Sequence, residues 1–120
     1  MSAFGQLPEI AAQGIWTGVA VRAVQGERLT LGIVELDSNA VVPEHAHENE
    51  QLGIVISGSV TFRVGEETRA LEPGGTWCIP ANAPHEVVAG PEGAVVIDVF
   101  APPRDDWVAF EPQRRPPRWP

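Results

Sequence analysis

Short apolar runs with a two-residue period, separated by glycine and proline, are the feature that most limits the folds open to this chain. Arg28–Ile33 alternates polar and apolar side chains, and Ser59–Val64 places Val60, Phe62 and Val64 on one face. Side chains of a strand alternate between its two faces, so this spacing indicates strands with one buried face. No stretch of ten or more residues shows a convincing helical period. The pattern predicts an all-β sandwich or barrel.

The expected strands follow one another at short intervals. They cover residues 15–24, 28–37, 41–47, 51–56, 59–64, 68–71, 76–80, 85–89 and 94–100. Turns are expected where glycine and proline gather, at Gln25–Gly26, Ser57–Gly58, Glu72–Gly75 and Gly90–Gly93. With 120 residues, the chain is expected to form a single domain over residues 1–110, a barrel with an N-terminal strand. Residues 111–120 form a proline- and arginine-rich tail, either a mobile arm or an extended strap docked on the barrel or on a partner chain, and its aromatic side chains favour the strap.

The charge balance argues against two classes of partner. Sixteen acidic residues against eight arginines, with no lysine, give a net charge of -8. Nucleic acid and anionic membrane surfaces both require a basic footprint, so neither is expected as a partner. No stretch is apolar enough for a transmembrane helix, and residues 1–13 lack the pattern of a signal peptide. The lone Cys78, between Trp77 and Ile79, is expected to be a small buried core residue, and a cytoplasmic location fits.

The three histidines of the chain stand where they could share one ion. His45 and His47 are two residues apart, so a strand places both imidazoles on the same face. His85 follows Ala83-Pro84 in a distant segment, and Gln51 completes a set of four. Neutral imidazole is the commonest metal ligand. One divalent transition metal is therefore expected. This donor set does not distinguish among Ni, Zn, Mn, Fe and Cu.

These residues resemble the two motifs of the cupin superfamily. The first, with His-x-His, a glutamate and a glycine, aligns with Asn39, His45, His47, Gln51 and Gly58. The second aligns with Gly74, Pro80, Asn82 and His85. Asn39 and Asn82 replace glycines, which fits because asparagine tolerates the left-handed backbone conformation. The resemblance implies a double-stranded β-helix (jelly-roll) barrel of the RmlC-like type, with the metal in its mouth.

Gln51 stands where the cupin motif has glutamate. Glu50 is the rival ligand, but the two-residue period favours Gln51. Three imidazoles and an amide leave the charge of a divalent ion uncompensated, which makes the ion a stronger Lewis acid than a carboxylate-ligated one.

The last expected strand and the segment after it carry a second group of candidate functional residues. Asp98 shares a face with Val96 and Phe100 inside an otherwise apolar run, and Arg104 follows two prolines. Together with His-x-His-x-x-Glu-Gln, this stretch is similar to the small cupins of pectin and alginate catabolism, which linearise unsaturated uronates. The resemblance implies metal ligands at His45, His47, Gln51 and His85, catalytic roles for Asp98 and Arg104, and substrate contacts from Phe100 and Arg104.

The function expected from this resemblance is proton transfer on a small acidic sugar-derived substrate, by a metal-dependent enzyme of isomerase or cyclase type. Asp98 would move the proton, Arg104 would clamp the carboxylate, and Phe100 would pack on the sugar. The net charge of -8 would not attract a uronate, so any attraction must be local. A cupin dioxygenase and a non-catalytic small-ligand-binding module remain alternatives, and Asp98 and Arg104 could instead form an ion pair that fastens the C-terminal segment. A homodimer is expected, because a second copy commonly covers exposed sheet edges.

Overall fold

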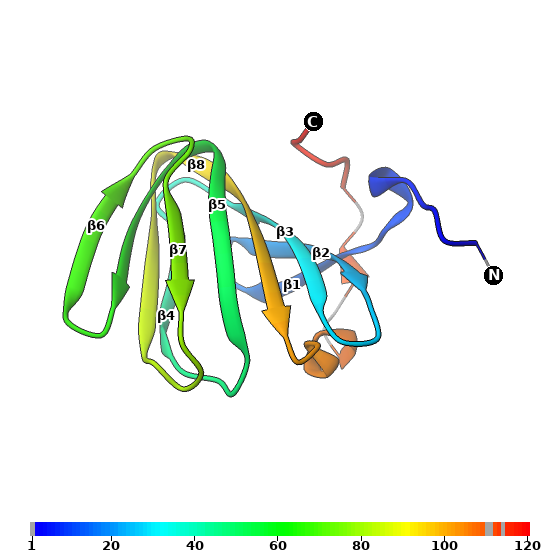
Figure 1. Ribbon diagram of the computed structural model, residues 1–120. Coiled ribbons are helices and arrows are strands. Elements are labelled where there is room, and N and C mark those ends of the chain that lie inside the picture. Colours follow the sequence, from blue (N-terminus) through cyan, green and yellow to red (C-terminus); the bar gives the residue numbers. More distant parts are fainter. Residues whose placement is uncertain (1, 110–111, 114) are drawn as a thin grey trace.

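The computed structural model is a β-barrel and describes residues 2–109, 112, 113 and 115–120 (Figure 1). Its elements, in chain order, are η1 (Leu7–Glu9), β1 (Ala12–Trp16), β2 (Val19–Gln25), β3 (Thr30–Leu36), β4 (Val41–His45), β5 (Glu50–Val64), β6 (Glu67–Leu71), β7 (Thr76–Ile79), β8 (His85–Ala101), η2 (Asp105–Ala109) and β9 (Pro112–Gln113). All pairings are antiparallel. The expected all-β jelly roll is confirmed. Neither short 3-10 helix of the described chain has the length or apolarity that a membrane span requires.

Two long, bent strands build the barrel. The first half of β8 lies between β4 and the second half of β5, and its second half lies between β3 and the first half of β5. Both strands change direction at bulges, where Gly58 pairs with Ala94 and Val60 with Ala89. The predicted turns at Ser57–Gly58 and Gly90–Gly93 are therefore wrong, since both segments lie inside strands. Glycine correctly marks the bends, but β5 and β8 pair with each other again beyond them, after a shift in register.

The predicted strand over residues 15–24 is also wrong as a single element. Thr17-Gly18 turns the chain, and Trp16 pairs with Val19 across a hairpin between β1 and β2. Gly18 has a φ of +75°, a conformation that glycine adopts without steric cost. The apolar alternation on both sides of the turn hid this break.

The hydrophobic core fills the inside of the barrel. Its buried apolar side chains come from every strand from β2 to β8 except β6, and include Val21, Leu36, Val55, Phe62 and Val96. On β7, Trp77 and Ile79 point inward, so Cys78 between them faces outward and is exposed. The expectation of a buried Cys78 is therefore wrong, because a period of two governs this strand.

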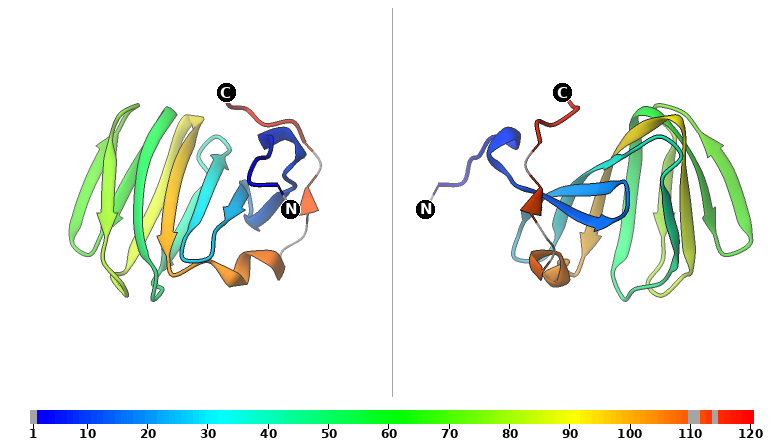
Figure 2. Two further views of the ribbon diagram at one scale, coloured as in Figure 1. Left: turned by 45° about the vertical axis from the view of Figure 1, so that its right-hand side comes forward. Right: turned by 180° about the vertical axis from the view of Figure 1, so that it is seen from behind.

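The two chain ends lie together at the β1–β2 side of the barrel (Figure 2). Here β9 pairs with β1, and the tail contacts the outer face of β2 and β3. Beneath it, the buried Glu35 accepts a hydrogen bond from Arg22 at 2.9 Å, and Arg115 and Arg118 lie within 3.5 Å of the same carboxylate. The expected boundary between residues 110 and 111 lies outside the described residues.

Candidate metal centre

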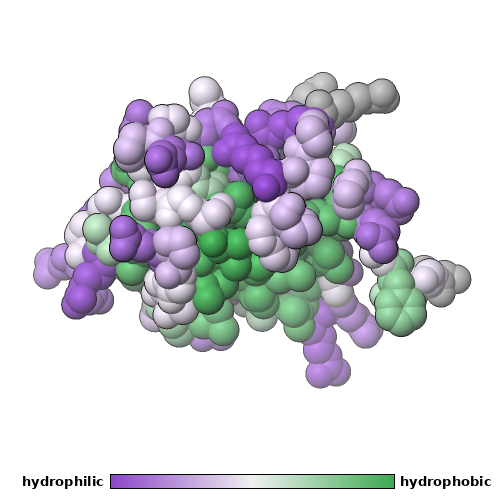
Figure 3. All heavy atoms as spheres, turned by 90° about the horizontal axis from the view of Figure 1, so that it is seen from above, coloured by the Kyte–Doolittle hydropathy of each residue, from purple (hydrophilic) through white to green (hydrophobic). Residues whose placement is uncertain are grey.

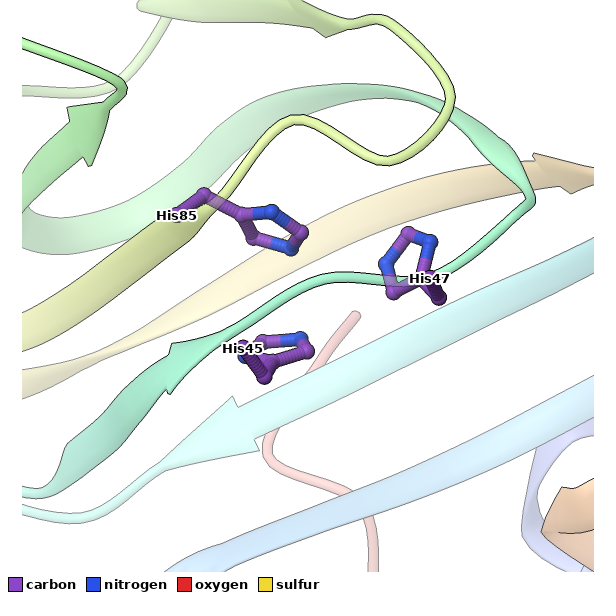
Figure 4. A group of neighbouring side chains, drawn as sticks. All are labelled: His45, His47 and His85. Carbon is purple, nitrogen blue, oxygen red and sulfur yellow. The ribbon is translucent and has the colours of Figure 1, made fainter.

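Strand pairing brings two of the three histidines together, and a loop brings the third. The expectation that one strand carries both His45 and His47 is wrong, because β4 ends at His45. His45 ends β4, His85 begins β8, and these two residues are directly paired across the ladder. His47 follows in the loop before β5 and turns its ring toward the other two (Figure 4). One nitrogen from each ring lies within 4.8 Å of the others. An ion about 2 Å from each nitrogen would hold them roughly 3–4 Å apart, so small ring rotations suffice to close the site.

The hydrogen bonds of the three rings fix their tautomers. The Nδ1 atoms of His45, His47 and His85 lie 2.9, 3.0 and 2.9 Å from the carbonyl oxygens of Pro43, Asn49 and Ala83. A carbonyl oxygen only accepts, so each Nδ1 carries the hydrogen and donates it. Each Nε2 then keeps its lone pair. This backbone-held tautomer is the form in which histidine ligates metals.

Burial keeps these rings neutral. It lowers the pKa of His85 to about 4, and lowers the pKa values of His45 and His47 below the ordinary 6.5, with the charge of Arg104 acting in the same direction. The Nε2 of His85 is buried, and it has no hydrogen-bond partner among the described residues. An orphaned buried lone pair costs free energy unless something binds it. The donor set therefore fits a cation.

Gln51 supplies the fourth converging atom. Its side chain is buried at the start of β5, whereas the neighbouring Glu50 is exposed. Its Oε1 lies 3.1 Å from the Nε2 of His47. With the tautomer fixed as above, both atoms are acceptors, and two acceptors at this distance fit a shared cation.

Residues 39 and 82, which frame the site in sequence, have φ values of 58° and 66°, so the left-handed conformation expected for both asparagines is confirmed.

Asp98 is buried beside this cluster and is joined to it through Gln51. Its Oδ1 accepts hydrogen bonds from Gln51 Nε2 at 2.9 Å and from Trp77 Nε1 at 2.7 Å. Burial raises the pKa of Asp98 to about 6, although these two donors and the charge of Arg104 oppose the rise. Trp77 was not singled out from the sequence, since only the register of β7, β5 and β8 brings it to Asp98.

Arg104 reaches the same cavity from the segment after β8. Its guanidinium lies 4.9 Å from the ring centre of Phe100 and 4.7 Å from that of Trp107. Asp106 accepts hydrogen bonds from its Nε at 3.0 Å and its NH2 at 2.9 Å. The ion pair that fastens the C-terminal segment is therefore formed with Asp106 rather than with Asp98. The edge that carries NH1 makes no hydrogen bond to a described residue and remains for a ligand.

One cavity is lined by all of these predicted site residues except His47. Its polar lining comprises His45, His85, Gln51, Asp98 and Arg104, and its remaining walls are apolar or aromatic. The enclosed space is about 50 Å³. A single water needs about 10–15 Å³ by this measure, so the enclosed part holds only a few water-sized groups. A larger ligand does not fit in this space alone. Arg104 also borders a separate hollow of about 310 Å³, whose lining includes His47, Asn49 and the acidic Glu48, Asp105 and Asp106.

Comparison with known proteins identifies the class. The cupin domain family matches residues 32–100, and the chain belongs to this family. The pectin degradation protein KdgF of Dickeya dadantii is 32% identical over 81 residues, which cover 67% of this chain and 74% of that protein.

Solved structures agree with this assignment. The structure of KdgF from Halomonas sp. superimposes with a TM-score of 0.81 at 31% identity, covering 88% of this chain and 98% of that one. An RmlC-like cupin from Shewanella frigidimarina gives a TM-score of 0.82 at 24% identity, covering 88% and 96%, and supports the fold.

Proposed function

We propose that this chain is a metal-dependent cupin enzyme that moves a proton on a small acidic sugar-derived substrate, with the linearisation of an unsaturated uronate as its reaction. The observation that carries this proposal is the Gln51 amide, which lies between His47 of the imidazole cluster and the buried carboxylate of Asp98. The similarity to two KdgF proteins, one described by its role in pectin degradation, supports the substrate class.

In this proposal His45, His47, His85 and Gln51 hold one divalent transition metal. When bound, the ion supplies Lewis-acid polarisation of a substrate oxygen. Asp98 is the general acid or base, since it is the one acidic side chain among the described residues that line the cavity. Both donors to Asp98 bind Oδ1, so Oδ2 is the oxygen left to exchange a proton with the substrate. Linearisation is an isomerisation, in which a proton removed at a hydroxyl is balanced by one delivered to the opening ring.

Arg104 and Phe100 position the substrate in this scheme. The open edge of the guanidinium would bind the uronate carboxylate, and Asp106 on the opposite edge would keep the plane of the fork fixed. The ring of Phe100 would pack on the apolar face of the sugar. This pairing also means that Arg104 and Asp106 together carry no net charge, so attraction of an anionic substrate depends mainly on the ion.

The test is turnover by the metal-loaded chain. A 4,5-unsaturated uronate monosaccharide should lose its ultraviolet absorbance, and an open-chain keto product should appear by NMR. Asp98→Asn should lower the rate about 10²–10⁴-fold, the usual contribution of a positioned proton carrier. Absence of turnover with Ni, Zn, Mn, Fe and Cu in separate preparations would contradict the proposal.

A cupin dioxygenase is the second candidate, because apolar side chains such as Val34, Leu36, Val42 and Val96 form most of the inner cavity wall. Oxygen uptake with a catechol, a flavonol or a thiol by the iron- or copper-loaded chain would favour it. Ligand binding without turnover of any of these compounds would favour a non-catalytic binding module.

We also propose that the chain forms a homodimer through the outer face of the barrel. Strands buried on both faces read as continuous apolar runs, and residues 94–100 of β8 are apolar except for Asp98, which points inward. Beside them the outward side chains of Leu52 and Ile54 on β5 are exposed, and apolar surface gathers in the lower centre of Figure 3. A second copy would bury this stripe. Light scattering of wild type and Leu52→Glu tests it: the variant should be monomeric, and a monomeric wild type would contradict the proposal.

A further inference from the structure

An amide side chain can present either of its two ends to a cation, but only the oxygen binds. At Gln51 the choice is made by Asp98, because an ionised carboxylate accepts hydrogen bonds and cannot donate them. Gln51 Nε2 donates to Asp98 Oδ1 at 2.9 Å, and this leaves Oε1 facing the Nε2 of His47 at 3.1 Å. The contact with Asp98 therefore sets which end of the amide faces the histidines.

Asp98 is itself held by an indole that crosses a neighbouring strand. Trp77 on β7, Gly53 on β5 and Asp98 on β8 stand in one row of the sheet. A Cβ at residue 53 would lie 2.2 Å from Trp77 Nε1, so only glycine lets the indole lie across β5. Trp77 Nε1 then donates at 2.7 Å to the same Oδ1 that accepts from Gln51. Rotation of the carboxylate would break both hydrogen bonds at once.

The opposite neighbour of Asp98 in the row is also glycine. Gly32 of β3 pairs with Asp98, and a Cβ there would lie 3.0 Å from the indole of Trp107. Glycines on both sides thus leave room for two indoles beside one carboxylate. Only Trp77 donates a hydrogen bond to it, whereas Trp107 packs against Phe100 with ring centres 4.9 Å apart.

We propose that Asp98 and Trp77 form the outer shell of the metal centre, holding the Gln51 oxygen toward the imidazoles so that affinity for the ion depends on both. This inference rests on the metal centre of the proposed function and adds a role for Asp98 besides proton transfer. It also changes the expected charge balance, because the four ligands are neutral but one of them is hydrogen bonded to a carboxylate. Trp77 is a positioning residue, acting through Asp98 and Gln51.

Calorimetric titration of Zn²⁺ into the chelator-stripped full chain, with no substrate present, tests this arrangement. Asp98→Asn keeps the shape and an oxygen that can accept both hydrogen bonds but removes the charge, and should weaken Zn²⁺ binding about tenfold, within the range seen when an outer-shell partner is changed. Trp77→Phe keeps a ring against Phe62 but removes the N–H, and should weaken binding about fivefold, the equivalent of one hydrogen bond. Trp119→Phe, a matched change in the C-terminal tail, should leave affinity unchanged.

The outcomes separate this inference from the proposed function. A wild-type chain that binds no Zn²⁺ overturns the metal centre and this inference with it. A wild type that binds Zn²⁺, together with Trp77→Phe and Asp98→Asn variants that bind it equally well, overturns the inference alone. Unchanged circular dichroism and unfolding temperature in Trp77→Phe would show that a loss of affinity does not come from misfolding.

A charge-swap cycle gives a second, independent readout. Gln51→Glu supplies an anionic ligand, but it also places a carboxylate where the donor to Asp98 stood, 2.9 Å from Oδ1. The single variant should therefore bind Zn²⁺ no more tightly than wild type. In the double variant Gln51→Glu/Asp98→Asn the repulsion is removed, and binding should be at least tenfold tighter than in Gln51→Glu. Additive effects of the two changes would contradict the coupling.

Discussion

The burial of Asp98 predicts that removing its charge stabilises the metal-free protein above about pH 6. The pKa of this carboxyl is about 6 in the folded chain against an ordinary 3.8, with burial as the main cause. Between these values the folded state binds more protons than the unfolded state, so stability falls as the pH rises through this window. The full penalty is present above about pH 6. One pKa unit corresponds to about 1.4 kcal/mol, so this penalty lowers the free energy of unfolding by about 3 kcal/mol.

The perturbation is Asp98→Asn, which can still accept the hydrogen bonds of Gln51 and Trp77 at its side-chain oxygen. Urea unfolding of chelator-treated wild type and variant between pH 4 and pH 8 measures the difference in free energy of unfolding. We expect the two proteins to be nearly equal near pH 4, and the variant to be more stable by up to about 3 kcal/mol at pH 7 and above. The lowered pKa values of the three histidines affect both proteins alike and largely cancel in the difference.

Asp106→Asn is the control with the opposite sign. The hydrogen bonds of Arg104 lower the pKa of the Asp106 carboxyl, so its contribution is present above its ordinary pKa and is lost as the pH falls. Because Asp106→Asn removes this exposed carboxylate, the variant should be slightly less stable than wild type at pH 7. A difference between Asp98→Asn and wild type that stays constant with pH would refute the reasoning about burial.

Three further changes probe the site. His85→Ala removes the buried Nε2 and should lower the affinity for Zn²⁺ at least a hundredfold in calorimetry; retained affinity would contradict its place among the ligands. Gly53→Ala brings a Cβ to 2.2 Å from Trp77 Nε1 and should cost about 1–3 kcal/mol in urea unfolding, whereas a neutral effect would show that the indole can move freely. Arg104→Lys replaces a planar fork by a point charge and should raise the KM for an unsaturated uronate about tenfold with little change in kcat; an unchanged KM would remove Arg104 from carboxylate binding.

Much of the barrel was predictable because its strands largely keep a period of two between bulges. The face of Asp98, Val96 and Phe100 was assigned correctly, and all three are buried. The same rule explains the error at Cys78, where apolar neighbours in sequence point to the opposite side of the strand. The breaks were harder to predict. Glycine marks both the hairpin at Thr17-Gly18 and the bulges at Ser57–Gly58, and only the pairing partners distinguish a turn from a bend.

The clustering of the three histidines was predictable from their spacing, but the surroundings of Asp98 were not. Trp77 lies 21 residues away along the chain, and its contact depends on the register of three strands and on a missing Cβ at residue 53. The pairing of Arg104 with Asp106 depends likewise on the short helix η2, which is too short to show a helical period in the sequence. Motif spacing predicts residues that converge on a ligand, whereas the residues that hold them follow from strand pairing.

The central claim is that three imidazoles and one carboxamide hold a single ion. Anomalous diffraction from crystals of the metal-loaded chain, measured at the absorption edge of that metal, tests it most directly. We predict one peak, about 2.0–2.2 Å from Nε2 of His45, His47 and His85 and from Oε1 of Gln51. A peak ligated by other side chains, or no peak in fully loaded crystals, would contradict this account.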